Sequence, residues 1–329
     1  MSIEVPYTTV RFHGTDEEIN AQWVEARKSG IGGSDVASIM GLNKYSSPLE
    51  VWMVKTGRAE SPDLSDKPAV YWGNVLEDVV ANEFKRRHPD LQVTKKNATL
   101  VSKKRPWAFA NIDRSLVDRC GNKGVLECKT VGARRASDWD EGVPDYYLTQ
   151  VTHYLSVTGY KYAWVAALIG GQDYREFYIE RDAEDILALD SAVDCFWRNY
   201  VVPGIPPALV GSKSEAETIL TTHSDPSDEY VSMLDADVPY LDEYIQLKEQ
   251  EKAIKERKQL IENKLKDAIG DNKGLQTETR RVTWSRSFTQ MFDKKRFLEE
   301  HPEITEAFEA CTSPKPRNNG LRISARKDS

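Results

Sequence analysis

Cysteine is scarce in this chain of 329 residues, and its four copies are scattered, with no Cys-x-x-Cys pair. Scattered cysteines argue against a zinc or iron–sulfur cluster and indicate a reducing compartment. No run of 18 apolar residues is present, so no segment reads as a membrane-spanning helix. The N-terminus lacks the charged and apolar regions of a secretory signal. We therefore expect a cytoplasmic protein that does not act at a membrane.

Other absences limit the chemistry. The chain has no Gly-x-x-x-x-Gly-Lys-Ser/Thr motif, so a P-loop and ATP binding are not implied. No internal repeat is visible, and the length allows one large domain or two. The formal net charge of −7 is not that of a protein that simply coats nucleic acid. It does not exclude DNA as a substrate, because the local field of a channel governs binding.

Two carboxylates and a lysine gather around a predicted hairpin. Asp113 precedes a turn-rich segment at residues 119–124, and Glu127-Cys128-Lys129 follows that segment. Residues i and i+2 of a strand share a face, so Glu127 and Lys129 point the same way, and the hairpin brings Asp113 near Glu127. Mg²⁺ prefers oxygen ligands, and a neighbouring lysine can orient or deprotonate a bound water. The combination suits phosphodiester hydrolysis, although similar spacing also occurs on surface hairpins without a catalytic role.

A helix predicted upstream of this hairpin, at residues 71–84, carries a further acid. Its apolar residues recur at helical spacing, and Glu77 lies toward their flank. Because an unpaired buried charge is costly, Glu77 either pairs with a base or serves a metal, unless its head reaches water at the margin.

A second helix is predicted downstream, at residues 146–155. Asp145 is a plausible N-cap, and Gly159 is a plausible stop. Positions i, i+3 and i+4 of this helix form one polar and aromatic stripe, made of Gln150, His153 and Tyr154. A lone histidine in such a place is more often structural than a ligand.

A glycine-rich turn near the N-terminus is a candidate anion site. Gly30, Gly32 and Gly33 allow close approach of the backbone to a ligand, and Ser34-Asp35 can cap the following helix. The N-terminus of a helix with a nearby arginine, here Arg27, is suited to bind an anion. A simple glycine turn with an N-cap would have the same sequence.

The remaining pattern predicts further helices and strands. We expect helices at residues 19–28, 48–56, 183–200, 239–269 and 294–300, and strands at residues 162–169, 174–180 and within 275–287. Residues 211–237 are polar and are expected to form a loose connection. The helix at residues 239–269 is expected to pack along a body or a partner, not to form a continuous heptad zipper.

A basic and aromatic cluster lies in the C-terminal stretch. Its members are Arg280, Arg281, Trp284, Arg286 and Phe288. Such a cluster suits contact with a nucleic-acid backbone and stacking on bases, and an ordinary solvated edge strand explains it equally well.

Taken in order, these motifs resemble the YqaJ-type viral recombinase exonucleases, which are relatives of phage lambda exonuclease within the PD-(D/E)xK nuclease superfamily. The most specific segments are residues 27–41 (RKSGIGGSDVASIMG) and residues 72–77 (WGNVLE). The resemblance implies a mixed α/β (α+β) fold with a restriction-endonuclease-like core, in which helices flank a central mixed sheet. We expect this nuclease domain at residues 1–210 and a long helix with a β-hairpin as an extension at residues 211–329.

The resemblance also implies the composition of the active centre. Divalent metal, Mg²⁺ or Mn²⁺ as a substitute, would be held by Glu77, Asp113, Glu127 and the backbone carbonyl of Cys128. Lys129 would activate or position the attacking water.

A second set of residues would serve the end of the DNA. Arg27 and Ser34 would bind the 5′-terminal phosphate of the digested strand, and Gln150 would lie beside both this phosphate and the active centre. The implied activity is digestion of double-stranded DNA from 5′ ends, leaving 3′ single-stranded overhangs. A homotrimeric ring, a single-strand-annealing partner and a phage or prophage origin are also implied.

Two alternatives remain open from the residues alone. One is a restriction-like endonuclease on the same core, which would cleave a closed circle. The other is a DNA-binding or scaffolding protein whose catalytic site has decayed. The intact residues Asp113, Glu127 and Lys129 argue against the second alternative.

Overall fold

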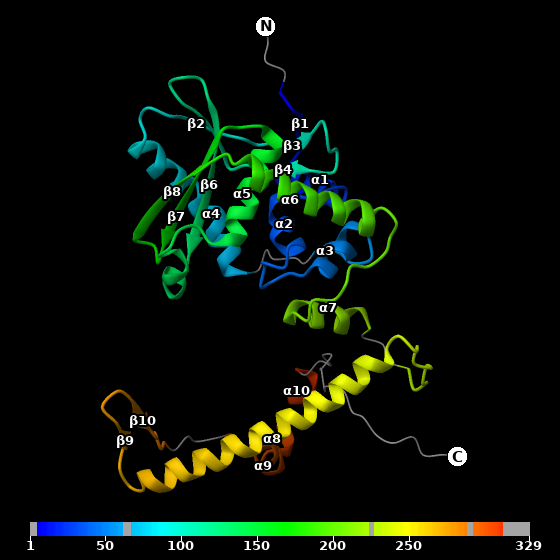
Figure 1. The fold of residues 1–329 in the computed structure, drawn as a ribbon, viewed down its shortest axis with the longest axis vertical. Coiled ribbons are helices and arrows are strands. Elements are labelled where there is room, and N and C mark those ends of the chain that lie inside the picture. Colours follow the sequence, from blue (N-terminus) through cyan, green and yellow to red (C-terminus); the bar gives the residue numbers. More distant parts are fainter. Residues whose placement is uncertain (1–4, 62–66, 224–226, 288–291, 312–329) are drawn as a thin grey trace. The chain divides into compact units, whose positions relative to one another are not determined.

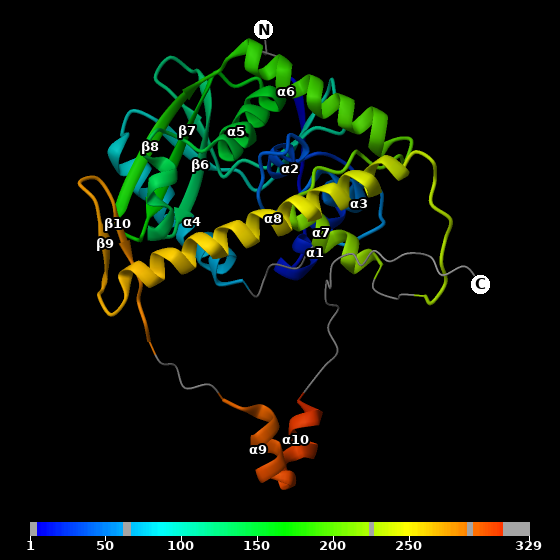
Figure 2. The same cartoon turned by 60° about the horizontal axis from the view of Figure 1, so that its bottom comes forward.

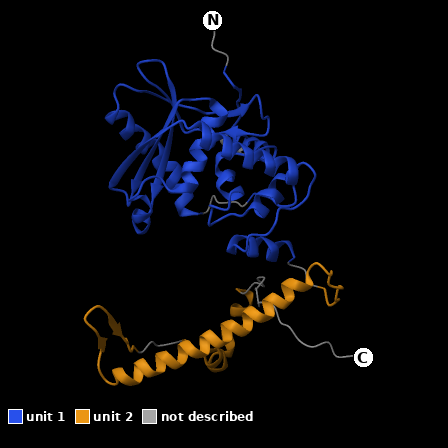
Figure 3. Ribbon diagram, in the orientation of Figure 1, with its two compact units in different colours: residues 1–223 blue, residues 224–329 orange. Residues whose placement is uncertain are grey.

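The computed structural model describes residues 5–61, 67–223, 227–287 and 292–311. The chain forms two compact units, residues 1–223 and residues 224–329 (Figure 3). The sequence placed this boundary at residues 210 and 211, but helix α7, Lys213–Thr222, belongs to the first unit. The buried carboxylate of Glu215 accepts hydrogen bonds from the backbone N–H groups of Val210 and Gly211, which holds the start of this helix. The expected loose connection is therefore wrong for its first part.

A five-stranded mixed sheet is the centre of the first unit (Figure 1). Its strands, in spatial order, are β2 (Gln92–Lys95), β5 (Arg114–Val117), β6 (Lys123–Val131), β7 (Tyr162–Ile169) and β8 (Asp173–Glu180). Strands β6 and β7 run parallel, and the other neighbours are antiparallel. Parallel neighbours need a crossover connection, which here contains helix α5, Asp145–Thr158.

Helices cover both faces of this sheet. Helix α4, Pro68–Arg87, packs Val80 and Phe84 against the face that carries Leu126. Helix α5 packs on the other face, which carries Val125. Since side chains alternate along a strand, the odd-numbered residues of β6 face α5. The sheet is the mixed α/β core, flanked by helices, that the sequence predicted.

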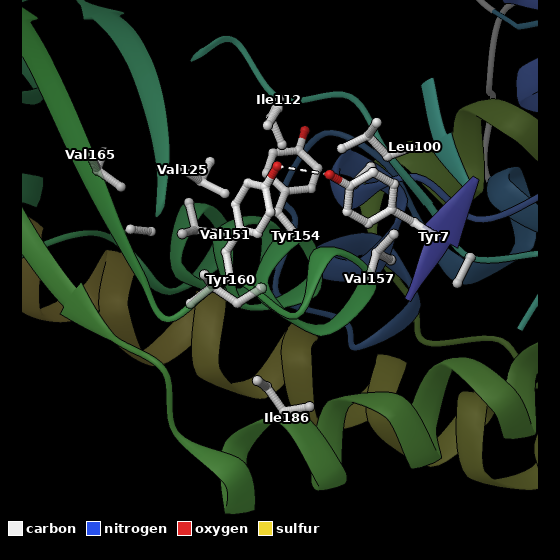
Figure 4. Close-up of a cluster of buried hydrophobic side chains, with 14 of the residues drawn as sticks. Tyr7, Leu100, Ile112, Val125, Val151, Tyr154, Val157, Tyr160, Val165 and Ile186 are labelled. Atoms are coloured by element: carbon white, nitrogen blue, oxygen red, sulfur yellow. Dashed lines mark hydrogen bonds between the residues drawn. The ribbon is translucent and has the colours of Figure 1, made fainter. Parts of the chain in front are cut away.

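The main apolar core lies on the α5 side of the sheet and extends to a smaller sheet (Figure 4). The strands of the smaller sheet are β1 (Tyr7–Val10), β3 (Thr99–Ser102) and β4 (Phe109–Ala110). Within the core, the hydroxyl groups of Tyr7 and Tyr160 form a buried hydrogen bond of 3.0 Å.

The helical part of the first unit has its own core, built around Val36, Trp52 and Val193. It consists of α1 (Asp16–Lys28), α2 (Gly33–Ile39), α3 (Pro48–Lys55) and α6 (Ala183–Phe196), followed by a π-helical turn at Trp197–Val201. Helix α2 lies beside α5 (Figure 2). This contact joins the helical part to the sheet.

Two predicted helix caps differ in the structure. Pro144, not Asp145, is the N-cap of α5, and Asp145 is the first helical residue. Gly32 is the N-cap of α2, and Asp35 takes part in the capping from the third helical position, because its carboxylate accepts a hydrogen bond of 2.9 Å from the backbone N–H of Gly32. The predicted stop at Gly159 is confirmed, because this residue has a φ of 69° at the C-cap of α5.

The second unit contains the 32-residue helix α8, Val238–Ile269. It is followed by a two-stranded hairpin, and then by two short helices. These elements are β9 (Gly274–Gln276), β10 (Arg281–Thr283), α9 (Lys294–Glu300) and α10 (Thr305–Ala310). In the predicted basic and aromatic cluster, the guanidinium of Arg286 lies 4.5 Å from the ring centroid of Trp284, whereas Phe288 is outside the described residues.

Across the described ranges, no helix is both long enough and apolar enough to cross a membrane.

Candidate active site

The hairpin of β5 and β6 brings the predicted acids together. Arg114 pairs with Leu126 in the register of the two strands, and Asp113 immediately precedes β5. The carboxylate of Asp113 accepts a hydrogen bond of 2.8 Å from the backbone N–H of Cys128. At the other end of the hairpin, the carboxylate of Asp118 accepts hydrogen bonds from backbone N–H groups of the turn. Asp113 is thereby fixed beside the segment that carries Glu127.

Glu127, Lys129 and Gln150 form one hydrogen-bonded group on the α5 side of the sheet. The Lys129 ammonium donates to Glu127 Oε1 at 2.6 Å and to Gln150 Oε1 at 3.2 Å. Gln150 Nε2 donates to Glu127 Oε1 at 2.8 Å and to the hydroxyl of Tyr154 at 2.9 Å. The ammonium also lies 4.7 Å from the ring centroid of Tyr147. Helix α5 therefore orients both residues that project from β6.

Burial places a high electrostatic cost on the two acids. Burial, and then the nearby Glu127, raises the pKa of Asp113 well above its ordinary value. Burial also raises the pKa of Glu127, although Lys129 opposes this change. Burial lowers the pKa of Lys129, but the Glu127 and Asp113 carboxylates outweigh it and leave this pKa above its ordinary value. The site therefore has excess negative charge that a bound cation would relieve.

The donor set of Asp113 and Glu127 fits a divalent cation. Glu127 is 2% exposed, and its Oε2 atom is buried without a hydrogen-bond partner. A carboxylate oxygen in this position is suited to coordinate a hard ion such as Mg²⁺. Within the described residues, however, no three His, Cys, Asp or Glu side chains are placed to hold one ion together. Two carboxylates are thus available, and further ligands would come from backbone or water.

Glu77 approaches the site from the α4 side of the sheet and is already paired. Its Oε1 atom lies 2.6 Å from Nη1 of Arg114, which also donates to the backbone carbonyl of Asp113 at 2.7 Å. The same arginine pairs with Asp78, which in turn lies 3.0 Å from Lys95. Of the two roles that the sequence left open for Glu77, the structure shows the ion pair.

The candidate anion site contains a buried lysine that the sequence analysis missed. Nη2 of Arg27 lies 3.1 Å from the hydroxyl of Ser34 and 3.4 Å from the carboxylate of Asp35. The Lys55 side chain is 2% exposed and lies 2.7 Å from the same carboxylate, and it donates to the backbone carbonyl of Arg27 at 2.7 Å. Burial raises the pKa of Asp35, but Lys55 and Arg27 outweigh it and leave this pKa below its ordinary value. The spacing of these residues along the chain gave no signal for this pairing.

The charges in this cluster leave one positive charge in excess, because Asp35 neutralises only one of Lys55 and Arg27. The Lys55 side chain is buried, whereas the Arg27 side chain is 30% exposed. The Arg27 guanidinium carbon lies 4.8 Å from the ring centroid of Trp23. The excess positive charge is therefore presented to solvent at Arg27 and Ser34, as an anion site requires.

Gly33 joins the anion site to the acidic site. A Cβ atom at this position would lie 2.5 Å from the ring of Tyr154 and 3.0 Å from Cγ of Gln150. Since only glycine allows this approach, the first turn of α2 rests directly on the helix that orients Lys129. The two predicted groups of site residues are thus neighbours in the fold.

His153 has a structural role, as expected for a lone histidine. Its side chain is fully buried, and Nε2 hydrogen-bonds to the carbonyl of Phe109 at 3.0 Å. Burial lowers the pKa of His153 to about 4, so the ring is neutral at pH 7.

The substitution Asp113→Asn should raise the melting temperature of the metal-free protein. An acid whose pKa is raised by folding has a less stable ionised form in the folded state. This cost is absent below the unfolded pKa of about 4, grows as pH rises from there to the folded pKa, and is constant above it. The difference in melting temperature between variant and wild type, measured in EDTA, should therefore widen from acidic to neutral pH.

Two comparisons check this prediction. Added Mg²⁺ should reduce the difference in melting temperature between Asp113→Asn and the wild type, because a bound ion stabilises the wild type. The variant Asp185→Asn, which changes an exposed acid on α6, should show no such widening. A difference for Asp113→Asn that stays constant with pH would contradict the electrostatic description of the site.

Two solved structures resemble parts of this chain. The alkaline exonuclease LHK-Exo from Laribacter hongkongensis matches 60% of this chain and 99% of its own, at 18% identity and a TM-score of 0.46. A phage-related exonuclease from Haemophilus somnus 129PT matches 53% of this chain and 94% of its own, at 11% identity and a TM-score of 0.39. Both likenesses are partial.

Sequence comparison is more specific. The model of the YqaJ-like viral recombinase domain matches residues 22–161, which include both candidate sites. The uncharacterized protein YqaJ from Bacillus subtilis (strain 168) is 34% identical over 289 residues, which are 87% of this chain and 89% of that protein. With a relative matched over most of both chains, this protein belongs to the family of the YqaJ-like viral recombinase domain.

Proposed function

We propose that this protein is a Mg²⁺-dependent deoxyribonuclease that digests duplex DNA from 5′ ends and leaves 3′ single-stranded overhangs. The observation that carries the proposal is the group of Asp113, Glu127 and Lys129, held together on one hairpin and oriented by Gln150. Membership of a viral recombinase family supports DNA as the substrate. Such an enzyme would act in the cytoplasm of a bacterial host and supply overhangs to a strand-annealing protein.

Each side chain has a distinct task in this proposal. Asp113 and Glu127 hold the metal, with the carbonyl of Cys128 and Glu77 as further proposed ligands. When bound, Mg²⁺ or Mn²⁺ polarises the scissile phosphate and lowers the pKa of a water ligand. Lys129 positions the attacking water and offsets the charge that develops on the phosphate. Gln150 keeps Lys129 and Glu127 in register. Glu77 pairs with Arg114 through Oε1 and would offer the metal its other carboxylate oxygen.

The decisive assay compares linear and covalently closed duplex DNA with purified protein in Mg²⁺, Mn²⁺ or EDTA. The proposal expects release of nucleotides from the linear duplex alone, and only with metal. Cleavage of the closed circle would favour the restriction-like alternative. No loss of either substrate under any metal would leave a DNA-binding or scaffolding role.

The exposed positive charge at Arg27 supports recognition of a 5′-terminal phosphate. Ser34 adds a hydroxyl donor on the first turn of α2, whose N–H groups favour an anion. Gly33 sets this turn against Gln150, so a phosphate bound there lies near the residues that perform hydrolysis. Digestion is then expected to start at the 5′ end.

The substitution Arg27→Gln should reduce the preference for a 5′-phosphorylated duplex over a 5′-hydroxyl duplex. A hydrogen bond to a charged group contributes about 1.5–3 kcal/mol, so the rate ratio of the two substrates should fall by roughly tenfold or more. The ratio is measured with two duplexes that differ only in the terminal phosphate. Arg86→Gln, which removes an exposed arginine on α4, is the matched control and should keep the wild-type ratio.

Two results would argue against this assignment. Equal wild-type rates on both duplexes would remove the phosphate role of Arg27 and Ser34. Faster attack at 3′ ends would contradict the proposed polarity as a whole.

We also propose that this protein assembles into a homotrimeric ring, as the lambda-like resemblance implies. An acidic monomer holds DNA weakly, because neutralisation of phosphates supplies most of the non-specific affinity. A closed ring would keep the enzyme on its substrate by topology.

A further inference from the structure

Helix α8 carries a regular seam that stays open to solvent in the described part of the chain. Tyr240, Leu247 and Ile254 are 69%, 53% and 66% exposed, and Ile261 is 45% exposed. Further residues lie between these four on the same face of the helix, so that successive members are separated by four and three residues in turn. Its eight members, called the α8 seam, are Tyr240, Tyr244, Leu247, Glu251, Ile254, Lys258, Ile261 and Leu265.

This spacing is that of the a and d positions of a coiled coil. Six members of the α8 seam are apolar, and a hollow of about 480 Å³ lies along it around Ile254 and Ile261. The interruptions that make the zipper discontinuous are Glu251 and Lys258. A helix of this kind is stabilised by burying its seam against another helix.

The two seam charges decide the direction of such a partner helix. In a parallel pair of identical helices, Glu251 would face Glu251 and Lys258 would face Lys258 in the same layers. Like charges in a buried seam are strongly unfavourable. A parallel three-helix bundle would also place like charges in the same layer, so α8 is not suited to form the three-fold contact of a ring.

An antiparallel pair places no two like charges in the same layer. The eight seam residues are symmetric about a point between positions 252 and 253, so all of them meet in one register. Tyr240 then lies opposite Leu265 of the second copy, and Tyr244 lies opposite Ile261. The remaining layers are Leu247 with Lys258, and Glu251 with Ile254.

The charges also fit this register. Each Glu251 lies opposite an apolar residue. Lys258 of the second copy is in the adjacent layer on one side, and Glu251 of the second copy is in the adjacent layer on the other side. Both charges also have an ion-pair partner on their own helix, because Glu251 lies 2.6 Å from Lys255, and Lys258 lies 3.9 Å from Glu262. Neither is therefore left unpaired when the seam closes.

The net charge of α8 changes sign along the helix, and this change also favours the antiparallel direction. Residues 238–251 contain four acidic residues and one basic residue, a net charge of −3. Residues 252–269 contain six basic and three acidic residues, a net charge of +3. Antiparallel pairing of two copies sets each acidic half against a basic half, whereas parallel pairing sets like against like.

We propose that the α8 seam is a two-fold interface, in which α8 of a second copy of this chain pairs with it in the antiparallel direction. The contact is isologous and closes on itself. It links two chains or, if the first units also close into rings of three, two rings into an assembly of six.

Charge reversal on the seam is the direct test. In full-length protein, Glu251→Lys should raise the dimer dissociation constant by at least about tenfold, because the introduced ammonium would meet Lys258 of the second copy. Lys258→Glu should do the same, and the double variant Glu251→Lys/Lys258→Glu should recover most of the loss. The remainder comes from the new like-charge pairs with Lys255 and Glu262 on the same helix. The control Glu249→Lys makes the same charge change two residues away, off the seam, and should leave the dissociation constant unchanged. Light scattering across a concentration series measures all five proteins.

Disulfide trapping then tests the direction. In a background with the exposed Cys120, Cys195 and Cys311 changed to serine, Tyr244→Cys and Ile261→Cys are made in separate chains. Antiparallel pairing expects cross-linked dimers when the two are mixed and oxidised, and far fewer with either alone. Parallel pairing would instead give cross-linked dimers with either variant alone and far fewer when the two are mixed.

Several outcomes would overturn the proposal. A wild-type monomer at all concentrations would mean that the seam is covered by the chain's own first unit or by another protein. An assembly with an odd number of chains, or one unaffected by Glu251→Lys, would place the contact elsewhere. Hydrolysis of a short duplex is measured in parallel and should be the same in all these variants, so the interface and the proposed nuclease activity fail independently.

Discussion

Hydrolysis of linear duplex DNA is expected to fall by about a thousandfold or more when Glu127 is replaced with glutamine. The substitution keeps the size and the hydrogen-bonding shape of the side chain but removes the buried charge that would hold the metal. Glu127 Oε1 accepts hydrogen bonds from both Lys129 and Gln150. The amide oxygen of glutamine can still accept both, so the variant tests the loss of charge and not the loss of these contacts. The measurement is the initial rate of nucleotide release in Mg²⁺.

A matched control separates this effect from general damage. Glu180 is an exposed acid on β8, and Glu180→Gln should retain the wild-type rate. Binding of the metal, followed by calorimetric titration, should be weakened in Glu127→Gln and unchanged in Glu180→Gln. A wild-type rate in folded Glu127→Gln protein would remove Glu127 from the catalytic group.

The second large effect is expected for Gly33→Ala. The new methyl group would lie 2.5 Å from the ring of Tyr154, closer than real Cβ contacts allow, and 3.0 Å from Cγ of Gln150, which is a tight contact. Overpacking of this kind costs about 1–3 kcal/mol of stability. Displacing Gln150 also disturbs Lys129, and a misplacement of about 1 Å can cost about a hundredfold in rate. Thermal unfolding and the rate of DNA hydrolysis should both decline.

The neighbouring glycine provides the control. A Cβ atom at Gly32 would have Asp35 Oδ2 as its nearest neighbour, at 3.7 Å, which is an ordinary contact. Gly32→Ala should therefore cost only about 0.5 kcal/mol, the effect of a poorer N-cap. If the two alanine variants behave alike, the close contact between α2 and α5 is not what joins the two sites.

Local pattern accounts for much of what could be predicted. The alternation of side chains along β6 predicted that Glu127 and Lys129 share a face, and the turn-rich segment predicted the hairpin that brings Asp113 near. Helix lengths followed from apolar spacing, as in α8. The ends of helices were predicted less accurately than their lengths. Gly159 was predicted correctly as the end of α5, because a left-handed C-cap favours glycine, whereas the N-caps of α2 and α5 were assigned to the wrong residues.

The predictions that failed have different causes. Helix α7 was missed although its signal is local, because Ser212 is its N-cap and the Glu215 carboxylate binds the backbone N–H groups of Val210 and Gly211, five and four residues earlier. Lys55 gave no signal, because its partner Asp35 lies on another helix. A lysine at the end of a short helix is ordinarily a solvated residue.

Local periodicity and turn signals in the sequence predicted the order of the elements and the proximity of Asp113, Glu127 and Lys129, and the family resemblance implied the class of the fold. The contacts between distant segments came only from the three-dimensional structure. The parallel pairing of β6 and β7 requires a crossover, and this crossover places Gln150 against Glu127 and Lys129. The same fold places Glu77 in an ion pair with Arg114 and buries Lys55 in an ion pair with Asp35. Such pairings depend on sheet order and on the packing of helices on its two faces, which no short stretch of sequence specifies.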